Sequence, residues 1–187
     1  MRASLGFALA ALFATMAVAG CSTKDTDQYP GDYMLGTYGV PDGLVLARGD
    51  VLDQFAEELD TDIPSNPGYI DPTSFDDPED PGPLPEKVYG AVYVNSDYDQ
   101  DDVESVTAVV LSVAIRMVSD ADADETVEDP EFCDDQGESA YALRDGKVFA
   151  ALFVAYDSDG EFPASRFADA AEEMRSATGA TDPCRAG

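Results

Sequence analysis

Side chains with oxygen ligands alternate along one short stretch of this chain, and that spacing is suited to binding a metal ion. In the segment NSDYDQDDVE, Asn95, Asp97, Asp99 and Asp101 recur at every second position. Oxygen ligands spaced in this way suit Ca²⁺ when a loop wraps around the ion. We therefore take Asp97, Asp99 and Asp101 as candidate calcium ligands, and Ca²⁺ is the one cofactor that the sequence suggests.

The match to a known calcium loop is incomplete. With Asp97, Asp99 and Asp101 as positions 1, 3 and 5 of an EF-hand loop, Asp102 stands where a glycine is needed. Ala108 stands where the closing glutamate is needed. The alternative interpretation is a solvated turn, because Asp and Asn are common in turns.

Most catalytic chemistries are excluded by composition. None of the 187 residues is a histidine, so Ser-His-Asp and Cys-His catalysis and histidine-ligated zinc are ruled out. No glycine-rich phosphate loop and no Gly-x-Ser-x-Gly motif occurs. Carboxylates remain, but with 39 acidic residues no glycosidase-like pair can be singled out.

The first twenty residues have the layout of a secretory signal peptide. Arg2 precedes an apolar stretch over residues 5–19, and no acidic residue occurs there. That stretch is shorter than the roughly 20 residues that a membrane-spanning helix needs. Val18-Ala19-Gly20-Cys21 follows, and it resembles the lipobox of bacterial lipoproteins.

This resemblance implies a covalent lipid anchor. In that class the Cys21 thiol is modified with diacylglycerol, the peptide is cut before it, and Cys21 begins the mature chain. The alternative is an ordinary signal peptide with Cys21 free or in a disulfide. We expect a protein held by acylated Cys21 at the cell membrane or outer membrane, on its extracytoplasmic side.

The cysteine count agrees with that expectation. Three cysteines are an odd number for an exported chain. If lipid occupies Cys21, Cys133 and Cys184 can form a disulfide in an oxidising compartment. A redox role is not indicated, because the two lack the Cys-x-x-Cys spacing of catalytic dithiols.

The charge disfavours two kinds of partner. Ten Lys and Arg against 39 Asp and Glu give a net charge of −29. Binding to nucleic acid, or to an anionic membrane surface through a basic patch, is disfavoured because those contacts depend on Lys and Arg.

Several segments carry clear strand or hairpin patterns. Residues 87–95, KVYGAVYVN, alternate as a strand does. Residues 103–118 fit both helical spacing and strand alternation, and their β-branched residues favour a strand from about Ser105, with a helix as the alternative. Asp145-Gly146 between two apolar runs predicts a hairpin. Residues 44–47 are predicted to form a short strand.

Helical patterns are expected in three places. Asp50 is placed to cap a helix over residues 51–59, and Ser119-Asp120 to begin a short acidic helix. An amphipathic helix after Pro163 is expected to end at Gly179.

The expected architecture is α+β, an antiparallel sheet of about four to five strands with two or three helices packed on one face. We expect a signal peptide over 1–20, a flexible tether over 21–42 and a single domain over 43–187. An acidic, proline-rich loop over 60–86 interrupts the domain, because its seven prolines exclude a regular helix or a central strand.

These expectations favour a non-enzymatic lipoprotein that binds a protein or a small ligand in the cell envelope. Two alternatives stay open. One is a calcium-stabilised surface module, and the other is a carboxylate-dependent hydrolase of envelope polymers.

Overall fold

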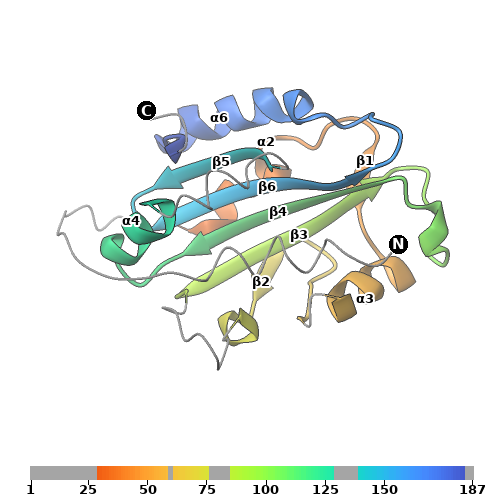
Figure 1. Cartoon of the computed structure of the whole chain (residues 1–187), viewed down its shortest axis with the longest axis horizontal. Helices are drawn as coiled ribbons and strands as arrows, with labels where there is room; N and C mark the ends of the chain where they lie inside the picture. Colours follow the sequence, from red (N-terminus) through yellow and green to blue (C-terminus); the bar gives the residue numbers. More distant parts are fainter. Residues whose placement is uncertain (1–28, 59–60, 76–84, 129–138, 184–187) are drawn as a thin grey trace.

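The computed structural model describes residues 29–58, 61–75, 85–128 and 139–183, and they form one antiparallel sheet with helices packed against it (Figure 1). The strands are β1 (Leu44–Leu46), β2 (Gly68–Ile70), β3 (Lys87–Asn95), β4 (Ala108–Arg116), β5 (Ser139–Asp145) and β6 (Val148–Asp157). The α-helices are α2 (Leu35–Tyr38), α3 (Gly49–Glu58), α4 (Asp120–Glu128) and α6 (Ala168–Thr178). Short 3₁₀ turns are η2 (Pro30–Tyr33), η3 (Pro72–Phe75), η4 (Val103–Ser105) and η6 (Ala164–Phe167).

The strands lie in the order β1-β3-β4-β6-β5, and β2 pairs with β3 outside this path. β1 pairs with the end of β3, and β2 with its beginning, so both short strands lie along β3. β3 and β4 are paired from Lys87 with Arg116 to Val94 with Val109. β4 and β5 are both antiparallel to β6. They therefore run in the same direction, and the connection through α4 crosses over β6.

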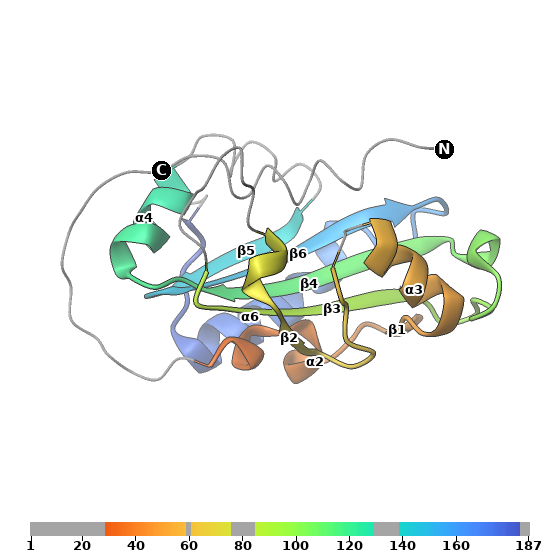
Figure 2. The ribbon, with the colours of Figure 1, turned by 90° about the horizontal axis from the view of Figure 1, so that it is seen from below.

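Helices cover both faces of the sheet, as Figure 2 shows. α2 and α6 pack on one face, where their apolar residues meet Ala91, Tyr93, Val110 and Leu152. α3 packs on the other face against the alternate strand residues, and Ala123 of α4 joins a further cluster there. The predicted α+β class is confirmed, but the helices are not confined to one face.

The central strand β4 explains why both faces are covered. Val110 and Ala114 are buried under α2 and α6, while Val109 and Leu111 are buried toward α3. A strand buried on both sides has no polar face, so its apolar run does not show a clean alternation. The favoured interpretation of residues 103–118, a strand, is confirmed over Ala108–Arg116.

The local predictions agree with the structure at the strand over 87–95, the helix after Asp50, the acidic helix and the C-terminal helix. Gly179 ends α6 in the left-handed region with φ of 81°, where glycine is favoured. The predicted hairpin is β5–β6, but its turn is Gly146-Lys147 because Asp145 pairs with Val148.

The tether predicted over residues 21–42 is wrong for residues 30–42. Tyr33, Met34 and Leu35 are at most 4 % exposed and belong to the core under α2 and α6. The backbone N–H of Leu35 also donates to the Oγ atom of buried Ser112, at 3.0 Å. The contact joins residues 77 positions apart, so no local periodicity signals it. The folded domain begins near Pro30 rather than Gly43.

The acidic, proline-rich segment contributes an edge strand. Within residues 61–75, Gly68–Ile70 form β2, and Ile70 is buried against β3 and β4. A three-residue strand with prolines on both sides fits an edge position, where no outer hydrogen bonds are needed. Residues 60 and 76–84 of the predicted loop lie outside the described residues, as do Cys21, Cys133 and Cys184.

No helix in the described ranges has the length and apolar character that crossing a bilayer requires.

Candidate functional site

The loop between β3 and β4 contains the predicted calcium ligands, and the structure does not assemble them into a metal site. Asp97, Asp99 and Asp101 are exposed. No group of three or more acidic or cysteine side chains in the described ranges is placed to hold a metal ion. The described side chains of this loop therefore do not converge on one point, and calcium binding by Asp97, Asp99 and Asp101 stays a prediction.

The loop's own polar groups use those carboxylate oxygens instead. Asp97 Oδ1 accepts a hydrogen bond from Asn95 Nδ2 at 2.7 Å, and Asp99 Oδ1 accepts one from the Asp101 N–H at 3.1 Å. Asp102 Oδ1 accepts from the Glu104 N–H at 3.0 Å. Carboxylates that accept from backbone groups two residues on form Asx turns, so the alternating pattern serves the turn geometry.

A groove beside α6 is a better candidate for a site. Its volume is about 680 Å³, and residues of α6 and of the chain that follows α2 line it. Tyr38, Val40 and Pro41 line one side. Arg166 and the polar face of α6 line the other, with three carboxylates, which are those of Asp169, Glu172 and Glu173.

Arg166 joins the two sides of the groove. Its Nη1 donates to the carbonyl oxygen of Glu161 at 2.7 Å and its Nη2 to that of Asp42 at 3.0 Å. The guanidinium carbon lies 4.9 Å from the ring centroid of Phe162. With two carbonyl partners and an aromatic ring, this cation is held in place as a structural clamp.

Gly43 lets the chain pass close to the same ring. Its φ is +94°, and a Cβ atom there would lie 3.2 Å from Cζ of Phe162. A larger residue would be strained by the backbone and crowded by the ring.

The carboxylates on the α6 side differ in their partners. Glu172 accepts from Arg175 Nη2 at 2.6 Å in an i,i+3 pair. Asp169 and Glu173 lie one turn apart and exposed, and no ion pair in the described ranges involves them. The groove therefore offers two unpaired negative charges next to a tyrosine and two apolar side chains.

This arrangement does not resemble a glycosidase pair. Glycosidases place two carboxyl groups on opposite sides of the bond to be cleaved. In the groove all three carboxylates come from one helix. Binding is the activity that the geometry supports.

A group of buried tyrosines lies beneath α2 in the same core. The Tyr33 hydroxyl donates to Asp145 Oδ2 at 2.7 Å, and burial together with that bond raises the pKa of Tyr33 above its usual value. Burial raises the pKa of Tyr93 to about 12 and also raises that of Tyr141. The Tyr141 hydroxyl has no hydrogen-bond partner among the described residues. These phenols are neutral at physiological pH.

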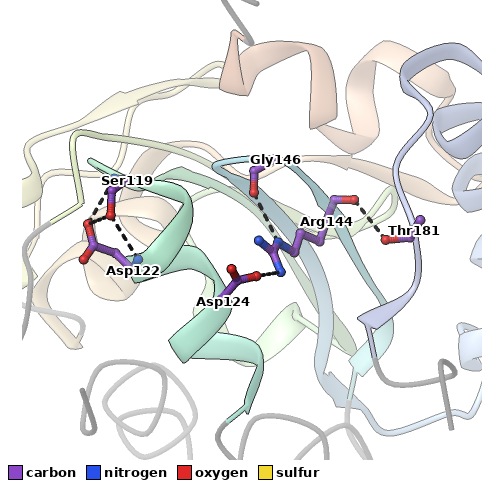
Figure 3. A network of polar contacts seen from close by, with 6 residues as sticks. All are labelled: Ser119, Asp122, Asp124, Arg144, Gly146 and Thr181. Atoms are coloured by element: carbon purple, nitrogen blue, oxygen red, sulfur yellow. Dashed lines mark hydrogen bonds and ion pairs between the residues drawn. The ribbon is translucent and has the colours of Figure 1, made fainter. Parts of the chain in front are cut away.

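A separate polar network connects α4, the β5–β6 hairpin and the C-terminal segment (Figure 3). Arg144 forms an ion pair with Asp124 of α4, and its Nε donates to the Gly146 carbonyl oxygen at 3.2 Å. The backbone of Arg144 exchanges two hydrogen bonds of 2.8 Å with Thr181. At the start of α4, Ser119 and Asp122 form a reciprocal capping box. The network is structural, since Arg144, its one cation, is held by Asp124 and the Gly146 carbonyl oxygen.

Sequence analysis missed the groove because half of it lies in the predicted tether. The cluster Tyr33-Met34-Leu35 was the available signal, since a flexible segment seldom carries three consecutive large apolar residues. The acidic face of α6 could be read from the sequence, but its position opposite residues 38–41 could not.

Comparisons with known proteins do not extend this description. No protein-family model matches the chain, and searches of curated proteins and of solved structures found no significant match.

Proposed function

We propose that this chain is a lipid-anchored, extracytoplasmic protein of the cell envelope that binds a ligand with a cationic group in the groove beside α6. The observation that carries the binding role is the groove itself, where the exposed carboxylates of Asp169 and Glu173 stand opposite Tyr38, Val40 and Pro41. The envelope location rests on the resemblance of residues 18–21 to a lipobox.

The charges of the groove favour a cation. Three carboxylates and one guanidinium line it, and the guanidinium already binds two carbonyl oxygens. A ligand ammonium or guanidinium group would meet Asp169 and Glu173 without displacing an existing ion pair. Apolar side chains on the facing side would contact the carbon atoms next to that cation.

Nothing in the groove supports hydrolysis, because no carboxylate faces another across it. We therefore propose binding without catalysis.

The test is titration of the protein with tetralysine and, as a control probe, tetraglutamate, followed by NMR at physiological salt. The variant pair Asp169→Asn and Glu173→Gln removes the two groove charges. We expect tetralysine to bind at least fivefold more weakly to this double variant, and tetraglutamate to bind neither protein.

A matched control separates the groove from the general acidity of the chain. Asp53 and Glu57 are exposed, lie four residues apart on α3, and have no part in the groove. Asp53→Asn with Glu57→Gln makes the same change in net charge and should leave tetralysine binding unchanged. Equal weakening by both pairs would mean that tetralysine responds only to net charge, and the groove proposal would fail.

A further inference from the structure

Three tyrosine side chains form a row on the surface where β2 meets β3. Tyr69 of β2 pairs directly with Tyr89 of β3, and their ring centroids are 6.0 Å apart at 76°. Tyr29, just before η2, also contacts Tyr89, at 5.1 Å and 69°. Tyr29 is 49 % exposed and Tyr69 is 53 % exposed. We call Tyr29, Tyr69 and Tyr89 the tyrosine row.

The row is a fixed and uncharged surface on a very acidic chain. Tyr89 packs against the core under α2 and α6, which holds the middle of the row in place. A hydrogen bond with the Tyr29 side chain raises the pKa of Tyr89 to about 12, so this phenol is neutral at physiological pH. Exposed tyrosines combine an apolar ring with a polar tip and concentrate at the interface between membrane and water.

The length of chain between Cys21 and the row limits how far the row can lie from a lipid on Cys21. Tyr29 is the eighth residue after Cys21, and a fully extended chain spans at most about 3.6 Å per residue, or roughly 29 Å in all. A domain of this size has a radius of gyration of about 15 Å. Tyr29 can therefore lie no farther than roughly 29 Å from the anchor, which is about twice that radius.

We propose that the tyrosine row rests in the headgroup region of a zwitterionic bilayer when Cys21 is acylated. This inference rests on the proposed lipid anchor. A zwitterionic surface is specified because a chain with a net charge of −29 is repelled by anionic lipid. The row would orient the domain and hold the β2 edge of the sheet toward the membrane.

The row is too small to bind a membrane by itself, since interfacial binding scales with the apolar area buried. A short tether changes this, because it makes the contact intramolecular at an effective concentration in the millimolar range. The row should therefore contact lipid in the acylated protein and not in a protein without the anchor.

The chain contains no tryptophan, so the fluorescence of a single introduced tryptophan can report how close that position lies to the lipid headgroups. We would purify acylated Tyr69→Trp protein from membranes and reconstitute it into phosphatidylcholine vesicles that carry a headgroup nitroxide quencher. Tyr156→Trp is the matched control. Tyr156 is 41 % exposed and pairs with Val109 of β4. Val109 in turn pairs with Val94, which is near the end of β3, whereas Tyr89 is near its beginning. Tyr156 therefore lies at the other end of the sheet from the tyrosine row.

We expect the fluorescence of Tyr69→Trp to be quenched at least threefold more strongly than that of Tyr156→Trp. Flotation of the vesicles tests the anchor separately. If the protein floats with the vesicles but both positions are quenched equally, the proposed contact between the tyrosine row and the bilayer is wrong, while the lipid anchor is still supported. Protein that does not float would overturn both.

A soluble glycan is the competing ligand for exposed tyrosines. If solubilised peptidoglycan fragments changed the fluorescence of Tyr69→Trp while vesicles did not quench it, the row would be a glycan site and the membrane assignment would be wrong. A Tyr69→Trp melting temperature within 2 °C of wild type would show that the substitution leaves the fold intact.

Discussion

Asn95 organises the β3–β4 loop through both ends of its side-chain amide. Its Oδ1 accepts from the N–H groups of Thr107 and Ala108 at 2.8 and 3.2 Å. Its Nδ2 donates to Asp97 Oδ1 at 2.7 Å and to the Ser105 carbonyl oxygen at 3.3 Å. The side chain is buried, with 4 % exposed. A single amide thus connects the two strand ends.

Replacing Asn95 should be costly. Asn95→Ala would leave buried backbone groups without partners, and each such group costs about 1–3 kcal/mol. We expect a loss of about 2–4 kcal/mol in the free energy of unfolding, measured by urea denaturation. Asp97→Ala is the control, because it removes one exposed acceptor and should cost less than about 1 kcal/mol. A calcium-dependent rise in Tm that Asp99→Asn abolished would contradict this account of the loop.

The buried tyrosines make stability sensitive to alkali. Their pKa values are raised in the folded state, to about 12 for Tyr93 and upward for Tyr141 and Tyr33. Above pH 10 these phenols ionise in the unfolded chain but not in the folded one, so unfolding releases protons and the free energy of unfolding falls as pH rises. Below pH 10 they confer no pH dependence.

An absorbance titration at 295 nm checks this prediction. We expect Tyr33, Tyr93 and Tyr141 to ionise together with unfolding, above pH 10. Tyr93→Phe should make stability fall less steeply above pH 10, by up to about 1.4 kcal/mol per pH unit. If all nine tyrosines ionised in one phase near pH 10 while the fold was retained, the burial of Tyr33, Tyr93 and Tyr141 would be refuted.

At the scale of elements, the sequence predicted what local patterns determine. Strand alternation over 87–95, the capping residue Ser119 and the stop at Gly179 each act within a few residues, and each was found. The helix after Arg48 was also found, but it begins at Gly49, so Asp50 lies in its first turn rather than at its cap. The helix on the second face, the pairing of β2 and the placement of η2 depend on contacts between distant residues. Leu35 with Ser112, and Arg166 with Asp42 across 124 positions, have no local signature.

The network around Arg144 bears on the predicted disulfide. Arg144 contacts Asp124 of α4 and Thr181, so the segments that lead to Cys133 and Cys184 start from neighbouring points of the fold (Figure 3). Cys184 is three residues beyond Thr181, and Cys133 is five beyond Glu128.

We therefore expect one disulfide between Cys133 and Cys184. Thiol counting on the unfolded, acylated protein should give no free thiol before reduction and two after it. Cys133→Ser should then expose one thiol, on Cys184. Two free thiols in unreduced protein would rule the bridge out.

At the scale of the whole molecule, the folded domain starts about a dozen residues earlier than the sequence suggested. Because Pro30 and Tyr33 are buried, the chain between Cys21 and the domain is eight or nine residues long. An anchored domain would therefore stand close to the bilayer, with its acidity keeping it off anionic lipid. The resemblance of residues 18–21 to a lipobox could be read from residue types alone, whereas the position at which the folded domain begins required the structure.

The modification of Cys21 is the premise shared by the envelope location, the short tether and the tyrosine row, and mass spectrometry of the purified membrane fraction tests it most directly. We predict a mature chain whose first residue is Cys21 carrying diacylglycerol, and a Cys21→Ala variant that is not recovered in acylated form. A mature protein in which Cys21 is unmodified, or which begins at another residue, would contradict the account.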